Sequence, residues 1–145
     1  MKKILVTIAI ITLGITTISA TANPGIDPKI ISAFKKEFSF AKNAKWQTKE
    51  DLIQVSFLLN DQSVTAWYNA DAELVTTARS ILYAQLPISV IKILDRSYPN
   101  ADFYGIIEVI HNNEVHYQLT TGMTKKAFVI KVTPTGVVYY KKKIK

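Results

Sequence analysis

The sequence predicts an α+β fold in which two helices pack on one face of an antiparallel sheet. After residue 22 the chain divides into two halves with the same order of signals. Each half opens with a helical pattern that starts at a proline and continues as four short stretches of alternating apolar residues. Helices segregated to one face of an antiparallel sheet define the α+β class. We therefore expect two tandem helix-plus-four-strand units, residues 23–80 and 81–145, in one compact body.

Residues 1–22 have the pattern of a secretory signal peptide. Lys2 and Lys3 form a basic head, residues 4–18 are mainly apolar, and Ala20-Thr21-Ala22 has the small-x-small form that signal peptidase accepts. We expect cleavage after Ala22 and a periplasmic or secreted product. Because the chain has no cysteine, we expect neither a disulfide nor a lipoprotein anchor. No later apolar run reaches the roughly 18 residues that spanning a membrane requires.

The helices are predicted from their caps and apolar spacing. Asp27 is the predicted N-cap of the first helix, with Pro28 at its first position. Pro87 takes the same starting role in the second helix, and Pro99 ends it. The predicted apolar stripes are Ile30, Ile31, Phe34, Phe38 and Ala41 in the first helix and Val90, Ile91, Leu94 and Tyr98 in the second.

The strands of the first half follow from alternation and turn residues. Two-residue turns at Lys49-Glu50 and Asp61-Gln62 put Trp46, Phe57 and Ala66 on the core face. The next turn runs from Asn69 to Glu73, with Ala72 in the left-handed region. After it, the core face is predicted to continue through three alternate residues, Leu74, Thr76 and Ala78.

The second half repeats the plan with strands near residues 101–111, 114–121, 126–133 and 136–144. Turn signals fall at Asn112-Asn113, at Gly122 and at Pro134-Thr135-Gly136. The segment between the halves is short, so we expect them to pack together.

Several of these core and turn residues occur together at a recognisable spacing: Ala33-Phe34, Phe38, Ala44-x-Trp46, Tyr68 with Ala72, Leu86-Pro87-x-x-Val90-x-x-Ile93 and Tyr98-Pro99. This pattern resembles the PepSY-like, beta-lactamase-inhibitor-like family of small envelope proteins. The resemblance implies two tandem helix-plus-four-strand units and export to a bacterial periplasm. It implies no catalytic residues and no ligand. Ala72 stands where the family usually has a glycine.

Candidates for chemistry are few. There is no Gly-x-Ser-x-Gly motif, no cysteine and no glycine-rich phosphate loop. His111, Glu114 and His116 surround one hairpin turn, and they would share a face if that turn has two residues. They are weak candidates for a metal site. We expect no enzyme, no cofactor and no nucleic-acid partner.

Aromatic residues that point away from the core are the more suggestive feature. Trp67 is predicted to face outward with Leu58 and Thr65 as neighbours, and Tyr104 and Tyr139 are the second-half candidates. Two readings stay open. The outward face binds a partner, or it packs against the other half or the terminus.

The basic excess gives an alternative function. The expected mature chain has 16 lysine and arginine residues against 11 acidic ones, and four lysines, Lys141, Lys142, Lys143 and Lys145, lie in the last five positions. Such a patch can bind polyanions or a membrane surface, or keep an edge strand from pairing. The leading expectation is a non-enzymatic binding protein that inhibits or modulates an envelope protein through its exposed sheet face. Polyanion or membrane-surface binding through the lysines is the alternative.

Overall fold

The computed structural model describes residues 25–123 and 126–144, so the predicted signal peptide lies outside the described residues. The order of one helix followed by four strands occurs twice. The elements are α1 (Pro28–Glu37), β1 (Lys42–Lys49), β2 (Leu52–Leu59), β3 (Gln62–Tyr68), β4 (Leu74–Ser80), the short 3₁₀ helix η1 (Tyr83–Gln85), α2 (Ile88–Ser97), β5 (Asp102–His111), β6 (Glu114–Met123), β7 (Lys126–Val132) and β8 (Val138–Ile144).

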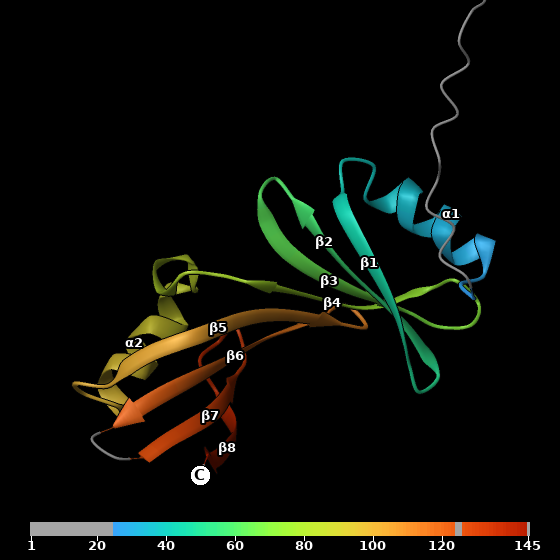
Figure 1. Cartoon of the computed structure of the whole chain (residues 1–145). Coiled ribbons are helices and arrows are strands. Elements are labelled where there is room, and N and C mark those ends of the chain that lie inside the picture. The colour runs from blue at the N-terminus through green and yellow to red at the C-terminus, as the bar shows by residue number, and fades with distance from the viewer. Residues whose placement is uncertain (1–24, 124–125, 145) are drawn as a thin grey trace, which may run out of the picture.

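The eight described strands form one antiparallel sheet in chain order. β4 pairs with β5 from Thr76 to Ser80, so the two halves share a continuous, strongly twisted sheet (Figure 1). The β4–β5 pairing joins the two halves through backbone hydrogen bonds.

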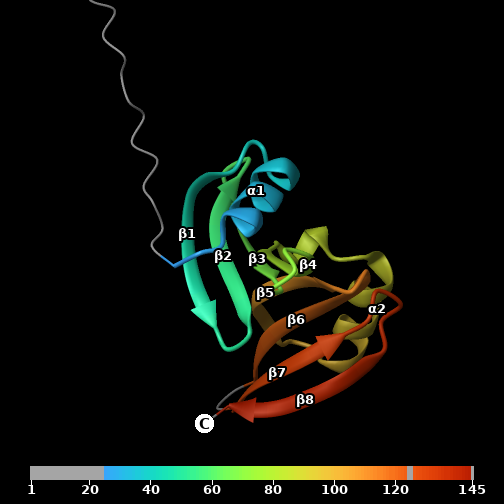
Figure 2. The ribbon, with the colours of Figure 1, turned by 90° about the vertical axis from the view of Figure 1, so that its right-hand side faces the viewer.

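Both helices pack on the same face of the sheet, here called the inner face. Cross-strand register carries this face from Val55 in β2 through Ala66 and Thr77 to Ile110 in β5. It continues through β6 to Val132 in β7. α1 covers the β1–β3 end, and α2 covers the β5–β8 end (Figures 1 and 2). The opposite face, here called the outer face, carries the alternate residues.

Each helix has its own core. Ile30 and Phe34 of α1 are buried against β2 and β3, and the Phe34 ring meets Trp46 and Phe57 edge-on at centroid distances of 5.2 and 5.0 Å. α2 inserts fully buried Val90 and Leu94 over β6 and β7. The predicted stripes therefore supply both cores. The description of the halves as tandem repeats stays a prediction.

The helix starts agree with the sequence to within one residue. Asp27 caps α1, because its Oδ1 accepts a hydrogen bond from the Lys29 backbone N–H at 2.9 Å, and Pro28 is the first helical residue. The second start was predicted one residue early: Pro87 is the N-cap of α2, and Ile88 is its first residue.

Two first-half turns differ from the prediction by one residue. They fall at Glu50-Asp51 and Asn60-Asp61, since Lys49 pairs with Leu52 and Leu59 with Gln62. Asn60 and Asp61 both have positive φ, which Asn and Asp adopt more readily than Gln. A turn displaced by one residue changes the cross-strand partner of each residue by two positions. Because side chains alternate with a period of two, every side chain keeps its predicted face.

The predicted core face of β4 was wrong beyond Leu74. Leu74 pairs with Tyr68, but Thr76 pairs with Trp67, so Val75 is an extra residue in a β-bulge. One extra residue reverses the alternation of everything that follows it. Thr76 and Ala78 therefore lie on the outer face.

The predicted turn at Gly122 was also wrong. Gly122 lies within β6, where it pairs with Asp102 of β5 on one side and with Ala127 of β7 on the other. The later turn is confirmed: Gly136 has a φ of 92° and donates its backbone N–H to the Thr133 carbonyl at 2.9 Å. Among the described residues, no helix is long and apolar enough to cross a membrane.

Thr121 is the buried polar side chain of the second core. Its Oγ1 finds no hydrogen-bond partner among the described residues. Thr121→Val keeps the shape and removes the unpaired hydroxyl, so we expect it to raise the free energy of unfolding by about 1 kcal/mol. Urea unfolding measures this. Thr120→Val, on the outer face, is the control, and an equal gain there would contradict the assignment.

Candidate binding surface on the outer sheet face

Trp67 is the centre of a row of side chains that crosses the outer face. The row runs from Gln54 in β2 through Trp67 in β3 to Thr76 in β4 and His111 in β5, each directly opposite the next. The Thr76 hydroxyl lies 2.7 Å from His111 Nδ1. Trp67 is partly buried and belongs to neither core, whereas its chain neighbours Ala66 and Tyr68 are fully buried. The outward direction of Trp67 is thus as predicted.

The predicted neighbours of Trp67 lie on the same face. Ser56 and Thr65 face each other with their hydroxyl oxygens 3.2 Å apart, and Leu58 follows Ser56 on β2. The sheet holds these short polar side chains in a fixed array around the indole. A partner would meet a preformed surface, which lowers the ordering cost of binding.

The described elements leave this face uncovered. The aromatic and core contacts of α1 and α2 are with inner-face residues, and η1 stacks Tyr83 on Phe103, also on the inner face. The described helices therefore do not cover the outer face. The partner-binding reading of the face stays a proposal.

Tyr139 and Tyr104 also lie on the outer face, on β8 and β5. The Tyr139 ring is 53% exposed and meets the His116 ring edge-on at 6.2 Å. Tyr104 lies on the outer side of β5 next to Gly122. The structure thus places the predicted aromatic residues on one face, but on three different strands, β3, β5 and β8.

The histidine hairpin has the two-residue turn that puts its side chains on one face. His111 pairs with Glu114, and His116 pairs with Val109. Asn112 Nδ2 lies 3.2 Å from His111 Nε2, so both ring nitrogens of His111 have polar neighbours. Among the described residues, no three His, Cys, Asp or Glu side chains are grouped so that they could hold a metal ion.

The sequence matches no protein-family model and no curated protein. The fold, in contrast, is similar to solved structures. A DUF2874 family protein from Bacteroides uniformis matches with a TM-score of 0.76 at 19% identity, over 81% of this chain and 89% of that chain. A BLIP-like protein from Bacteroides fragilis matches with a TM-score of 0.74 at 20% identity, over 86% of this chain and 90% of that chain. The fold is BLIP-like.

A third match widens the comparison. A protein from Bacteroides eggerthii, provisionally described as periplasmic, has a TM-score of 0.76 at 19% identity, over 81% of this chain and 88% of that chain. None of the three is described as an enzyme. At these identities the likeness establishes the BLIP-like α+β fold. The PepSY part of the predicted resemblance stays a prediction.

The outer face of the BLIP-like sheet carries more positive than negative groups. Its strand positions include Lys45, Lys49 and Lys131, set against Asp102 and Glu114. Lys142, opposite Val129, adds another positive charge.

The C-terminal lysines are not gathered on one face. Lys141 and Lys143 pair with inner-face residues, and Lys142 pairs with an outer-face residue. Lys141 Nζ lies 4.9 Å from the centre of the Tyr98 ring and 4.6 Å from that of Phe128. Lys145 lies outside the described residues. β8 is an edge strand of the BLIP-like sheet, and lysines there hinder pairing with another chain.

His116 makes the stability of the BLIP-like sheet depend on pH. Burial first, then the charges of Lys131 and His111, lower the pKa of His116. The unfolded chain therefore takes up a proton before the folded chain does, and stability falls as the pH drops through about 6.5 toward the lowered folded pKa. We expect His116→Gln to flatten this loss in urea unfolding between about pH 7 and pH 5. If the free energy of unfolding of His116→Gln fell with pH as steeply as that of the unchanged protein, the role given to His116 would be contradicted.

One inner-face ion pair was missed by the sequence analysis. Arg79 Nε donates to Glu108 Oε1 at 2.6 Å across β4 and β5. The two residues are far apart in sequence. Arg79 reaches the inner face because of the bulge at Val75, and no sequence signal marked that bulge.

Proposed function

We propose that this protein is a non-enzymatic envelope protein that binds a protein partner through the outer face of its sheet. The observation that carries the proposal is the placement of Trp67. A large amphipathic side chain stands outside both cores, in an array of short polar residues that the described helices leave uncovered. Tryptophan is enriched among the residues that dominate interface energies.

The chemistry of the face points to an acidic partner. Lys45 and Lys49 lie on β1, next to the β2 end of the Trp67 array, and acidic side chains on a partner would pair with them. Such charges at the rim raise the association rate more than the affinity. Inhibition or modulation of an envelope enzyme is the form of binding that the predicted family resemblance suggests.

Export belongs to the proposal. The predicted signal peptide of residues 1–22 directs the chain out of the cytoplasm, and one solved protein of similar fold is provisionally described as periplasmic. The partner is accordingly sought in the envelope.

A pull-down from envelope extract tests the proposal. The purified protein is the bait, with washes at low and at high salt and identification by mass spectrometry. One protein retained through high salt supports binding through an aromatic and hydrogen-bonded interface. Recovery of acidic material alone, all of it lost at high salt, would contradict the proposal and favour the lysine-based alternative, because salt screens exposed charges within about 8 Å.

A further inference from the structure

The inner face has an uncovered strip between the two helices. Thr77, Arg79, Glu108 and Ile110 lie on the inner face of β4 and β5, yet none belongs to the core of either helix. Ile110 is 38% exposed although it faces the helix side of the sheet. The strip follows from the architecture, since α1 and α2 each cover only their own end.

The strip is hollowed. A cavity of about 400 Å³ lies over it, with Phe38 at the C-cap of α1, Leu59, Val64 and Ile110 among its lining residues. Its volume is within the range of small-molecule pockets, and like them it combines a mainly apolar lining surface with a few polar groups.

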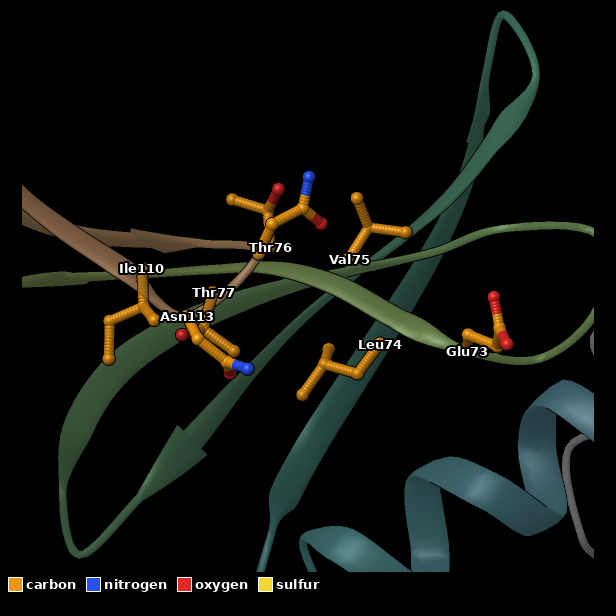
Figure 3. Close-up of a pocket in the computed structure, with 8 residues that line it drawn as sticks. Glu73, Leu74, Val75, Thr76, Thr77, Ile110 and Asn113 are labelled. Carbon is orange, nitrogen blue, oxygen red and sulfur yellow. The ribbon is translucent and has the colours of Figure 1, made fainter.

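A second hollow of about 360 Å³ extends the first toward the Asn112-Asn113 turn and shares Thr77 and Ile110 with it. Figure 3 shows Leu74 and Ile110 on the side of β4 where α1 lies, with Val75 and Thr76 on the other side. The two hollows adjoin at Thr77 and Ile110, and together they are called the groove below.

Arg79 places positive hydrogen-bond donors at the first hollow. Its side chain is 48% exposed, whereas that of Glu108 is only 14% exposed. Glu108 Oε1 accepts a hydrogen bond from Arg79 Nε, and the Glu108 carboxylate also interacts with the Tyr117 hydroxyl. A guanidinium has five N–H donors. Only the Nε donor of Arg79 has a hydrogen-bond partner among the described residues, so the four donors on its two Nη groups remain for a ligand.

We propose that this groove binds a small carboxylate-bearing amphiphile, with the carboxylate on the Nη groups of Arg79 and the hydrocarbon body against Phe38, Leu59, Val64 and Ile110. Guanidinium groups bind carboxylates through paired N–H donors, and the partly buried Glu108 holds Arg79 in position through Nε. A hollow of this size suits a small molecule better than a protein surface. The inference concerns the face opposite the proposed partner surface and goes beyond the proposed function.

Decanoate is the probe for this site, with 1-decanol as the uncharged analogue. Isothermal titration of the purified protein is expected to show saturable decanoate binding and weaker decanol binding. Arg79→Gln combined with Glu108→Gln removes both charges of the pair without leaving one unpaired. We expect this double variant to weaken decanoate binding by roughly tenfold and to leave decanol binding nearly unchanged.

Two further variants separate the groove from general effects. Ile110→Trp fills the shared part of the groove at a partly exposed position, and we expect it to weaken both ligands. Lys45→Gln removes one positive charge from the outer face, and we expect it to bind decanoate as tightly as the unchanged protein. We expect the same of Trp67→Ala. Absence of saturable decanoate binding, equal binding of decanoate and decanol, or equal weakening by Lys45→Gln and the double variant would overturn the inference.

Discussion

Trp67→Ala is expected to weaken binding of the envelope partner by about 2 kcal/mol or more, a roughly thirtyfold loss of affinity. The indole is the largest side chain in its row, and the row otherwise consists of Gln54, Thr76 and His111. Its removal takes away the apolar contact that the surrounding polar groups would shield from water. Calorimetric titration with the partner identified by pull-down gives the affinity.

The fold is expected to survive this substitution, because Trp67 belongs to neither core. The melting temperature should therefore change little. Phe40→Ala is the matched control, since Phe40 is an aromatic residue 79% exposed in the loop between α1 and β1. A folded Trp67→Ala variant that binds as tightly as the Phe40→Ala variant would contradict the role given to Trp67.

Gly136→Ala is expected to lower the free energy of unfolding by about 3 kcal/mol. Two costs add. Alanine at a φ of 92° is strained by about 1–2 kcal/mol. Its Cβ would also lie 2.8 Å from Ile93 Cγ1 and 3.0 Å from the Ser89 carbonyl oxygen, and such overpacking costs about 1–3 kcal/mol. The β7–β8 turn would be pushed away from α2. Urea unfolding followed by circular dichroism measures the loss.

Gly105→Ala separates the two costs. Gly105 also has a positive φ, 58°, but a Cβ there would meet only Thr120 Oγ1 at 3.7 Å, an ordinary contact. It should therefore show the strain alone, about 1 kcal/mol. Equal losses in the two variants would show that the turn yields to the extra methyl group and does not pack tightly on α2.

Sequence patterning predicted the layers of this protein well because alternation survives small errors in turn position. The first two turns lie one residue from their predicted places, yet Trp46, Phe57 and Ala66 are on the inner face and Trp67 is on the outer face. An error that moves the pairing by two positions leaves each side chain on its face. The helical stripes were equally readable, since Phe34 and Leu94 are buried as their spacing predicts.

A single extra residue in a strand makes prediction from alternation fail for the residues that follow it. The bulge at Val75 turned Thr76 to the outer face, where it meets His111, and turned Arg79 to the inner face, where it meets Glu108. Both contacts join β4 to β5 and depend on tertiary register. The groove and the middle of the candidate surface could therefore not be predicted from the sequence.

Site-specific photo-cross-linking tests the central claim most directly. A photoreactive amino acid is placed at Thr65, beside Trp67 on the outer face, and in a second variant at Lys36, exposed on α1 on the helix side. Each variant is irradiated with envelope extract. The account predicts a covalent complex with one partner from position 65 and none from position 36. Cross-linking from position 36 without any from position 65 would contradict it.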